Sequence, residues 1–207
     1  MKKVICFGDS NTFGFNPKDG SRYCPQVRWT SVLGSILGEG YEIKEEGCNN
    51  RTGFVPNPDG IIQSGQTCLR SCLNKHNNFD IFVLALGTND LQCLFSIDEN
   101  VVLNGLKSLT AQVRQVSPDS KIIIIHPVIL SEDVLNGYFS FQFNKESISL
   151  SMWIQDLFRQ FGKNESCVLL DINQHVSPSS IDGLHYSEDS HKIIAKLVAN
   201  AILVKRE

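Results

Sequence analysis

Five short runs of the chain have the residue pattern of β-strands. They cover residues 2–7, 41–47, 79–86, 121–128 and 166–172. Three of these runs are continuously apolar, as in KIIIIHPV at residues 121–128, and such runs are typical of strands that are buried on both faces of a sheet.

Between these runs, apolar residues recur at the spacing of amphipathic helices in four segments. The positions are Trp29, Val32, Leu33, Ile36 and Leu37; Val102, Leu106, Leu109, Val113 and Val116; Ile154, Leu157, Phe158 and Phe161; and Ile194, Leu197, Val198 and Ala201. Residues 61–75 form a weaker helix candidate.

Strands that alternate with helices predict an α/β fold whose parallel sheet is covered on both faces. With five strands the chain has the size of a small doubly wound domain, for which the strand order 2-1-3-4-5 is common. No repeat or linker interrupts residues 1–207, so we expect a single domain. Residues 14–26 and 128–146 lack periodicity and are too long for simple connections, so we expect them to form surface loops that shape a site.

Composition narrows the possible partners. The formal net charge is −3 and there is no run of Lys or Arg, which argues against nucleic acid and anionic lipid and favours small neutral or weakly charged partners. The apolar run near the N-terminus is too short for a signal peptide or a membrane span. The seven cysteines show neither a CxxC pair nor zinc-ligand spacing, so we expect reduced thiols, no metal and a cytoplasmic location. The oligomeric state stays open, a homo-oligomer included.

Polar residues follow the first three predicted strands directly. The strands lead into GDSNT at residues 8–12, GCNNRT at residues 47–52 and GTND at residues 87–90. In the order 2-1-3 these strands are neighbours, and such sheets bind ligands beyond the carboxyl ends of their strands, so we expect Ser10, Asn50 and Asn89 to cluster there. The loop after the fifth strand carries DGLH at residues 182–185 and is long enough to bring His185 over Ser10.

These residues supply the groups that acyl transfer requires. A serine such as Ser10 becomes a good nucleophile when an imidazole such as that of His185 takes its proton, and Asp182 can orient that imidazole. The backbone N–H groups of Ser10 and Asn50 and the side-chain amide of Asn89 could donate to an oxyanion.

Each of these residues also has a simpler role open to it. Ser10 could be a helix N-cap, Asn89 and Asp90 could begin the next helix, and Asp182 could form a turn. We interpret Asp90 as structural.

Further residues are candidates for contact with the substrate. Asp9 adjoins the serine, and His126 ends the fourth strand as either a rim or a packed histidine. Tyr138 and Phe139, with Phe141 and Phe143, follow the same strand and could either cap a small pocket or pack into the core. His191, at the start of the last helix, is expected to be solvated, and Arg28 and Arg51 to be hydrogen-bond donors that hold the fold.

Four blocks of the chain resemble those of the SGNH (GDSL) hydrolases, in order and over essentially the whole chain. They are GDSNT at 8–12, the glycine and asparagine of EEGCNNRT at 45–52, GTND at 87–90 and DGLH at 182–185. With VRW at 27–29, they resemble more narrowly the bacterial arylesterase branch. The resemblance implies a flavodoxin-like three-layer αβα sandwich with Ser10 as nucleophile, His185 as base, Asp182 as its orienting group and Asn89 in the oxyanion hole. Asn50 and Gly53 depart from the branch, which tends to have a small residue and a threonine there.

The expected protein is therefore a serine esterase that hydrolyses small acyl esters through an acyl-enzyme, without metal or organic cofactor. A pocket capped by aromatic residues predicts a preference for acetyl to butyryl groups. A carbohydrate deacetylase, a thioesterase and a lysophospholipase are alternatives on the same site. A catalytically silent binding domain is an alternative of another class, against which the complete set of Ser10, Asn89, Asp182 and His185 argues.

Overall fold

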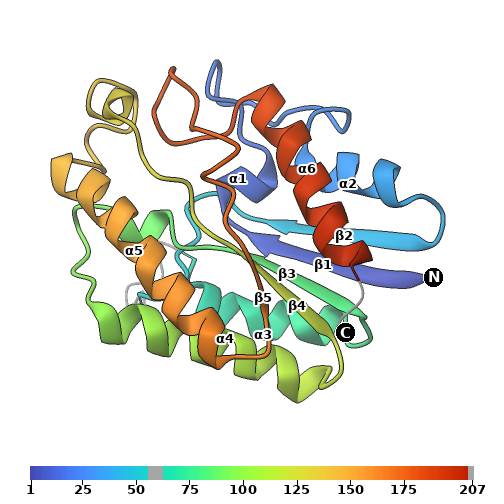
Figure 1. Cartoon of the computed structure of the whole chain (residues 1–207). Helices are drawn as coiled ribbons and strands as arrows, with labels where there is room; N and C mark the ends of the chain where they lie inside the picture. Colours follow the sequence, from blue (N-terminus) through green and yellow to red (C-terminus); the bar gives the residue numbers. More distant parts are fainter. Residues whose placement is uncertain (56–62, 205–207) are drawn as a thin grey trace.

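The computed structural model describes residues 1–55 and 63–204, and within them five parallel strands form one sheet in the order β2-β1-β3-β4-β5 (Figure 1). The strands are β1 (Lys2–Gly8), β2 (Tyr41–Gly47), β3 (Ile81–Ala85), β4 (Lys121–Ile125) and β5 (Val168–Leu170). The α-helices are α1 (Ser10–Phe13), α2 (Trp29–Leu37), α3 (Gly65–Lys75), α4 (Glu99–Val116), α5 (Lys145–Asn164) and α6 (Glu188–Leu203). Two 3-10 helices, η1 (Asn89–Leu91) and η2 (Glu132–Leu135), complete the described elements. The predicted strand order is confirmed.

Helices cover both faces of the sheet, which makes the fold a three-layer αβα sandwich. Successive side chains of a strand point to opposite faces, and in β1 Val4 and Cys6 pack into the cluster that contains α2 and α6. Ile5 and Phe7 pack instead into the cluster that contains α3, α4 and α5. Figure 1 shows these two groups of helices on opposite sides of the sheet.

The apolar runs were longer than the strands that they predicted. Leu86, Val128 and Ile172 lie inside the predicted runs but beyond β3, β4 and β5, and all three are buried. A continuous apolar run therefore reports burial, which extends past the last residue that pairs with a neighbouring strand. The weaker helix candidate begins at Gly65 as α3, and residues 61 and 62 of that prediction lie outside the described residues.

Close packing at the carboxyl end of the sheet sets the position of the first helix. A side chain at Gly8 would overlap the Thr12 hydroxyl, and one at Gly47 would overlap the backbone of Phe13. The two glycines therefore let α1 lie directly against the ends of β1 and β2. Asp9 caps this helix, because its carboxylate accepts a hydrogen bond of 2.9 Å from the backbone N–H of Asn11.

Candidate active site

A chain of hydrogen bonds joins Ser10, His185 and Asp182 at the carboxyl end of the sheet. The Nε2 atom of His185 lies 2.9 Å from the Ser10 hydroxyl, and its Nδ1 atom lies 2.6 Å from Oδ2 of Asp182. Ser10 is 8% exposed, and Asp182 and His185 are each 2% exposed. Ser10 lies far from Asp182 and His185 in the chain, and the fold brings the three residues together as the sequence predicts.

The surroundings of Asp182 keep its carboxylate charged. Burial raises its pKa, but hydrogen bonds from the His185 ring and from the backbone N–H groups of Leu184 and His185 lower it more, so the pKa lies below its ordinary value. A carboxylate only accepts hydrogen bonds. The Nδ1 atom of His185 must therefore carry the proton, which leaves Nε2 free to accept from the Ser10 hydroxyl.

Asn11 links helix α1, which begins at Ser10, to the loop that carries His185. Its Oδ1 accepts from the backbone N–H of Tyr186 at 2.9 Å, and its Nδ2 donates to the carbonyl of Leu184 at 3.4 Å. These two hydrogen bonds hold the backbone on either side of His185 in place. Sequence reasoning assigned no role to Asn11, although its place in the GDSNT block was a signal for one.

The Ser10 hydroxyl opens onto a cavity of about 170 Å³. It is lined by Ser10, Phe15, Asn49, Asn50, Asn89, Phe139, Gln142, Leu184 and His185. The three residues that were predicted as oxyanion donors, Ser10, Asn50 and Asn89, all lie in this lining.

Aromatic side chains flank the imidazole and separate this cavity from a larger one. The Phe15 ring lies 4.3 Å from the His185 ring, and the Phe139 ring lies 5.1 Å from it, between centroids. Both phenylalanines also line the adjoining cavity of about 520 Å³, with Tyr138 and Asp182 among its other walls. Residues 14–26 and 128–146 thus shape the site, as predicted.

The predicted aromatic cluster divides between the site and the core. Phe143 is buried in the core, whereas Phe141 is 67% exposed and lines neither cavity. Tyr138, which is 81% exposed, and Phe139 are the two members that line a cavity.

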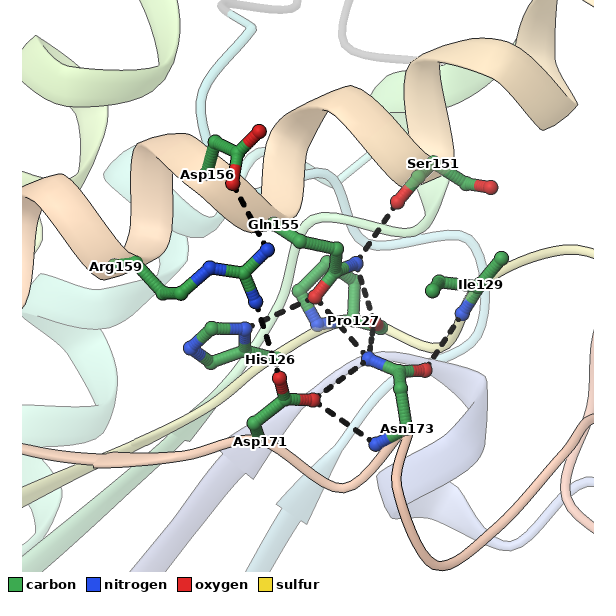
Figure 2. A network of polar contacts seen from close by, with 9 residues as sticks. All are labelled: His126, Pro127, Ile129, Ser151, Gln155, Asp156, Arg159, Asp171 and Asn173. Carbon is green, nitrogen blue, oxygen red and sulfur yellow. Dashed lines mark hydrogen bonds and ion pairs between the residues drawn. The ribbon is translucent and has the colours of Figure 1, made fainter.

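Asp9 and His126 do not line either of these cavities, which corrects their prediction as substrate contacts. Both line a separate space of about 10 Å³. The Asp9 carboxylate serves as the helix cap, and burial raises its pKa to about 7. Figure 2 shows the Nδ1 atom of His126 bound to Oε1 of Gln155, at 2.9 Å, within a network of amide and carbonyl groups. Burial lowers the pKa of this histidine.

The expectation of a solvated His191 was wrong, because the first turn of α6 packs against the start of α2. His191 is fully buried, and its Nδ1 atom lies 3.3 Å from the backbone N–H of Trp29. Burial lowers its pKa to about 3, with a smaller contribution from the charge of His185.

Two residues that were interpreted as structural do hold the backbone. Arg51 donates from Nη1 to the carbonyls of Gly8, at 2.8 Å, and Glu46, at 2.5 Å. The Asp90 carboxylate accepts from three successive backbone N–H groups, those of residues 53–55.

Glu46, Cys72 and His76 form the one group of metal-ligand type among residues 1–55 and 63–204. Their ligand atoms lie within 4.8 Å of one another, and none of the three lines the Ser10 cavity. The Glu46 carboxylate already accepts from Lys75 at 2.8 Å and pairs with His76 at 2.6 Å, so its charge is balanced by neighbouring side chains. The seven cysteines are free thiols. In the part of the chain that the structure describes, no helix is both long and apolar enough to cross a membrane.

A family model and several solved structures match this chain. The model of the GDSL-like Lipase/Acylhydrolase family matches residues 6–193. A carbohydrate acetylesterase from Sinorhizobium meliloti is 28% identical, with 98% of each chain covered and a TM-score of 0.89. An aryl esterase from M. smegmatis in an inhibitor-bound form is 26% identical, with 98% of each chain covered and a TM-score of 0.89. No curated protein sequence matches the chain significantly.

Proposed function

Because the chain belongs to the GDSL-like lipase/acylhydrolase family, we propose that it is a serine esterase that hydrolyses short-chain acyl esters through an acyl-enzyme. The observation that carries the proposal is the continuous hydrogen-bonded path from the Ser10 hydroxyl through His185 to the charged Asp182.

The reaction begins when the Ser10 oxygen attacks the ester carbonyl while Nε2 of His185 takes the hydroxyl proton. Asp182 keeps the proton of the imidazole on Nδ1 and stabilises the imidazolium that forms. The negative charge that develops on the carbonyl oxygen is stabilised by the N–H groups of Ser10 and Asn50 and by the Asn89 amide.

The tetrahedral intermediate then expels the alcohol, which takes its proton from Nε2 of His185 and leaves the acyl group on Ser10. A water molecule that loses its proton to the same nitrogen hydrolyses this acyl-enzyme. Nε2 of His185 takes part in every one of these proton transfers. The proposed reaction therefore needs no metal and no organic cofactor.

The two cavities suggest where the parts of the ester bind. The oxygen of the leaving alcohol must lie within reach of His185 Nε2 in the 170 Å³ cavity, and the rest of the alcohol can extend past Phe15 and Phe139, which line both cavities, into the cavity of 520 Å³. We place the alcohol there and the acyl group in the 170 Å³ cavity beside Asn50 and Asn89. The smaller volume lies below the range of about 300–1,000 Å³ that drug-sized ligands occupy, which favours a short acyl group.

A chain-length series tests this placement. We expect kcat/KM for p-nitrophenyl esters from acetate to octanoate to be highest at or before butyrate, with Ser10→Ala as the inactive control. A long open trough would instead increase kcat/KM about fourfold for each added methylene, since burying one contributes about 0.8 kcal/mol. A steady rise to octanoate would favour a lysophospholipase or long-chain thioesterase.

A second candidate within the same chemistry is deacetylation of a carbohydrate. It is supported by the likeness to the S. meliloti acetylesterase and by the lining of the larger cavity, where Lys18 and Asp19 could bind hydroxyl groups near Phe139. Acetylated sugars compared with phenyl acetate at equal concentration would decide between the two alcohols. A binding domain without activity would hydrolyse neither ester, and its Ser10 would not react with a fluorophosphonate.

A further inference from the structure

Gln92 binds the side chains of two of the three residues that we propose as donors to the oxyanion. It follows η1 directly, is 1% exposed and does not itself line the Ser10 cavity. Its Nε2 donates to Oδ1 of Asn50 at 2.7 Å and to Oδ1 of Asn89 at 3.1 Å. Both protons of the Gln92 amide are therefore used to hold asparagine side chains.

The polarity of this network is set by a backbone carbonyl. Nδ2 of Asn89 donates to the carbonyl of Arg51 at 3.1 Å, and a carbonyl oxygen can only accept. This bond fixes which end of the Asn89 amide carries the nitrogen, so Oδ1 must face Gln92 and receive its donor. If the Gln92 amide were reversed, two oxygen atoms would face each other.

We propose that Gln92 is a positioning residue that orients Asn50 and Asn89 for the oxyanion, an inference that rests on the proposed esterase function. With one Nδ2 proton of Asn89 held by Arg51, the other is directed by the same rigid amide plane and has no acceptor among the described residues. Asn50 has φ +62, a conformation that asparagine tolerates better than most residues, and the bond to Gln92 secures it. Its backbone N–H likewise has no acceptor in the described part of the chain.

The other end of Gln92 supports this assignment. Its Oε1 is buried and has no hydrogen-bond partner among the described residues. An unpaired buried acceptor lowers the stability of the fold, and an apolar side chain of the same size would avoid this cost. The two bonds from Nε2 are what the amide adds at this position.

Three variants test the role. Gln92→Met keeps the approximate size and removes both bonds, while Gln92→Glu keeps the shape and replaces the donors with acceptors. Gln155→Met is the matched control, because Gln155 is also a buried glutamine with hydrogen bonds from both ends of its amide, but these bonds hold His126 and the backbone of Pro127 and Ser151 (Figure 2). The kcat of each variant is counted per site that a fluorophosphonate labels, so that unfolded protein does not contribute.

We expect Gln92→Met to lower kcat for p-nitrophenyl acetate about 10- to 100-fold with little change in KM, because the donors remain but are no longer held. Gln92→Glu should approach the loss of about 100- to 1,000-fold that removal of one donor causes. Gln155→Met should lower Tm and leave kcat within about twofold of the wild type.

A double variant shows whether Gln92 acts through Asn89. In the Asn89→Ala background, Gln92→Met should lower kcat by a smaller factor than in the wild type, since part of what it holds is gone. Equal factors in both backgrounds, or a wild-type kcat in both Gln92 variants, would overturn the proposal. The esterase function fails separately, if the wild type itself neither hydrolyses the ester nor reacts with the fluorophosphonate at Ser10.

Discussion

His185 and His126 are both buried histidines near the carboxyl ends of the sheet, and both bind an oxygen through Nδ1. For His185 the oxygen belongs to a carboxylate, and Nε2 meets the hydroxyl of Ser10 at the wall of a cavity. For His126 the oxygen belongs to a neutral amide, and the ring packs against Phe158 at 5.1 Å. Burial and a partner on Nδ1 are thus common to both. The difference that matters for a base is a charged partner on one nitrogen and a reactive hydroxyl on the other.

The charges around the two imidazoles differ. A carboxylate beside an imidazole stabilises the imidazolium, which forms in the proposed reaction each time Nε2 takes a proton. A neutral amide cannot compensate for the loss of hydration, so burial lowers the pKa of His126 and keeps its ring neutral. The surroundings of His185 are thus suited to proton transfer, and those of His126 to packing.

We expect the largest effect on kcat when the hydroxyl of Ser10 or the imidazole of His185 is removed. Ser10→Ala and His185→Ala should each lower kcat by a factor on the order of 10⁶, and the double variant should be no worse than either single one, because the residues act as a unit. Steady-state kinetics on p-nitrophenyl acetate measures all three. Substantial turnover by purified Ser10→Ala would rule out the mechanism.

The carboxylate can be tested without changing its shape. Asp182→Asn places a donor where the carboxylate accepts, so His185 would carry its proton on Nε2 and could not take the Ser10 proton. We expect kcat to fall about 10⁴-fold. Similar kcat values for Asp182→Asn and the wild type would mean that the charge of Asp182 is not what distinguishes His185 from His126.

Ser10, Asp182 and His185 could be located from the sequence, because each stands in a short block at the end of a strand or in the last long loop. Spacing along the chain did not reveal the roles of Gln92 and Asn11, because these roles depend on partners far away in the chain, although Asn11 lies within the GDSNT block. Gln92 binds Asn50, 42 positions earlier, and Asn11 binds Tyr186, 175 positions later. Helical position also misled the expectation for His191, since the first turn of a helix is usually solvated but here packs against α2.

Replacing the second histidine should change stability and leave catalysis intact. His126→Phe keeps an aromatic ring beside Phe158 and removes the bond to Gln155. We expect the free energy of unfolding to fall by about 0.5–1.5 kcal/mol, as for a typical hydrogen bond, with kcat/KM within about twofold of the wild type. Urea unfolding and ester hydrolysis on the same preparation measure the two quantities. A tenfold loss of kcat/KM with an unchanged unfolding midpoint would place His126 in the active site after all.

His191 extends the comparison to acid stability. Its pKa is about 3 in the folded protein and about 6.5 in an unfolded chain, so between these values the unfolded state binds more protons. The stability that this difference contributes is complete above about pH 6.5 and is lost as the pH falls toward 3. Asp9, whose pKa is raised to about 7, acts in the opposite direction over much of this window, so the slope of the wild type alone does not isolate the histidine.

The variant His191→Asn does isolate it, because the asparagine oxygen can still accept from the backbone N–H of Trp29. We expect its unfolding free energy to depend on pH less steeply than that of the wild type, by up to about 1.4 kcal/mol per pH unit, which is the value for one proton. Urea midpoints measured at half-unit steps from pH 4 to pH 7 give both slopes. Parallel curves for the two proteins would mean that His191 is not held neutral by its burial, and the contrast with His185 would then rest on His126 alone.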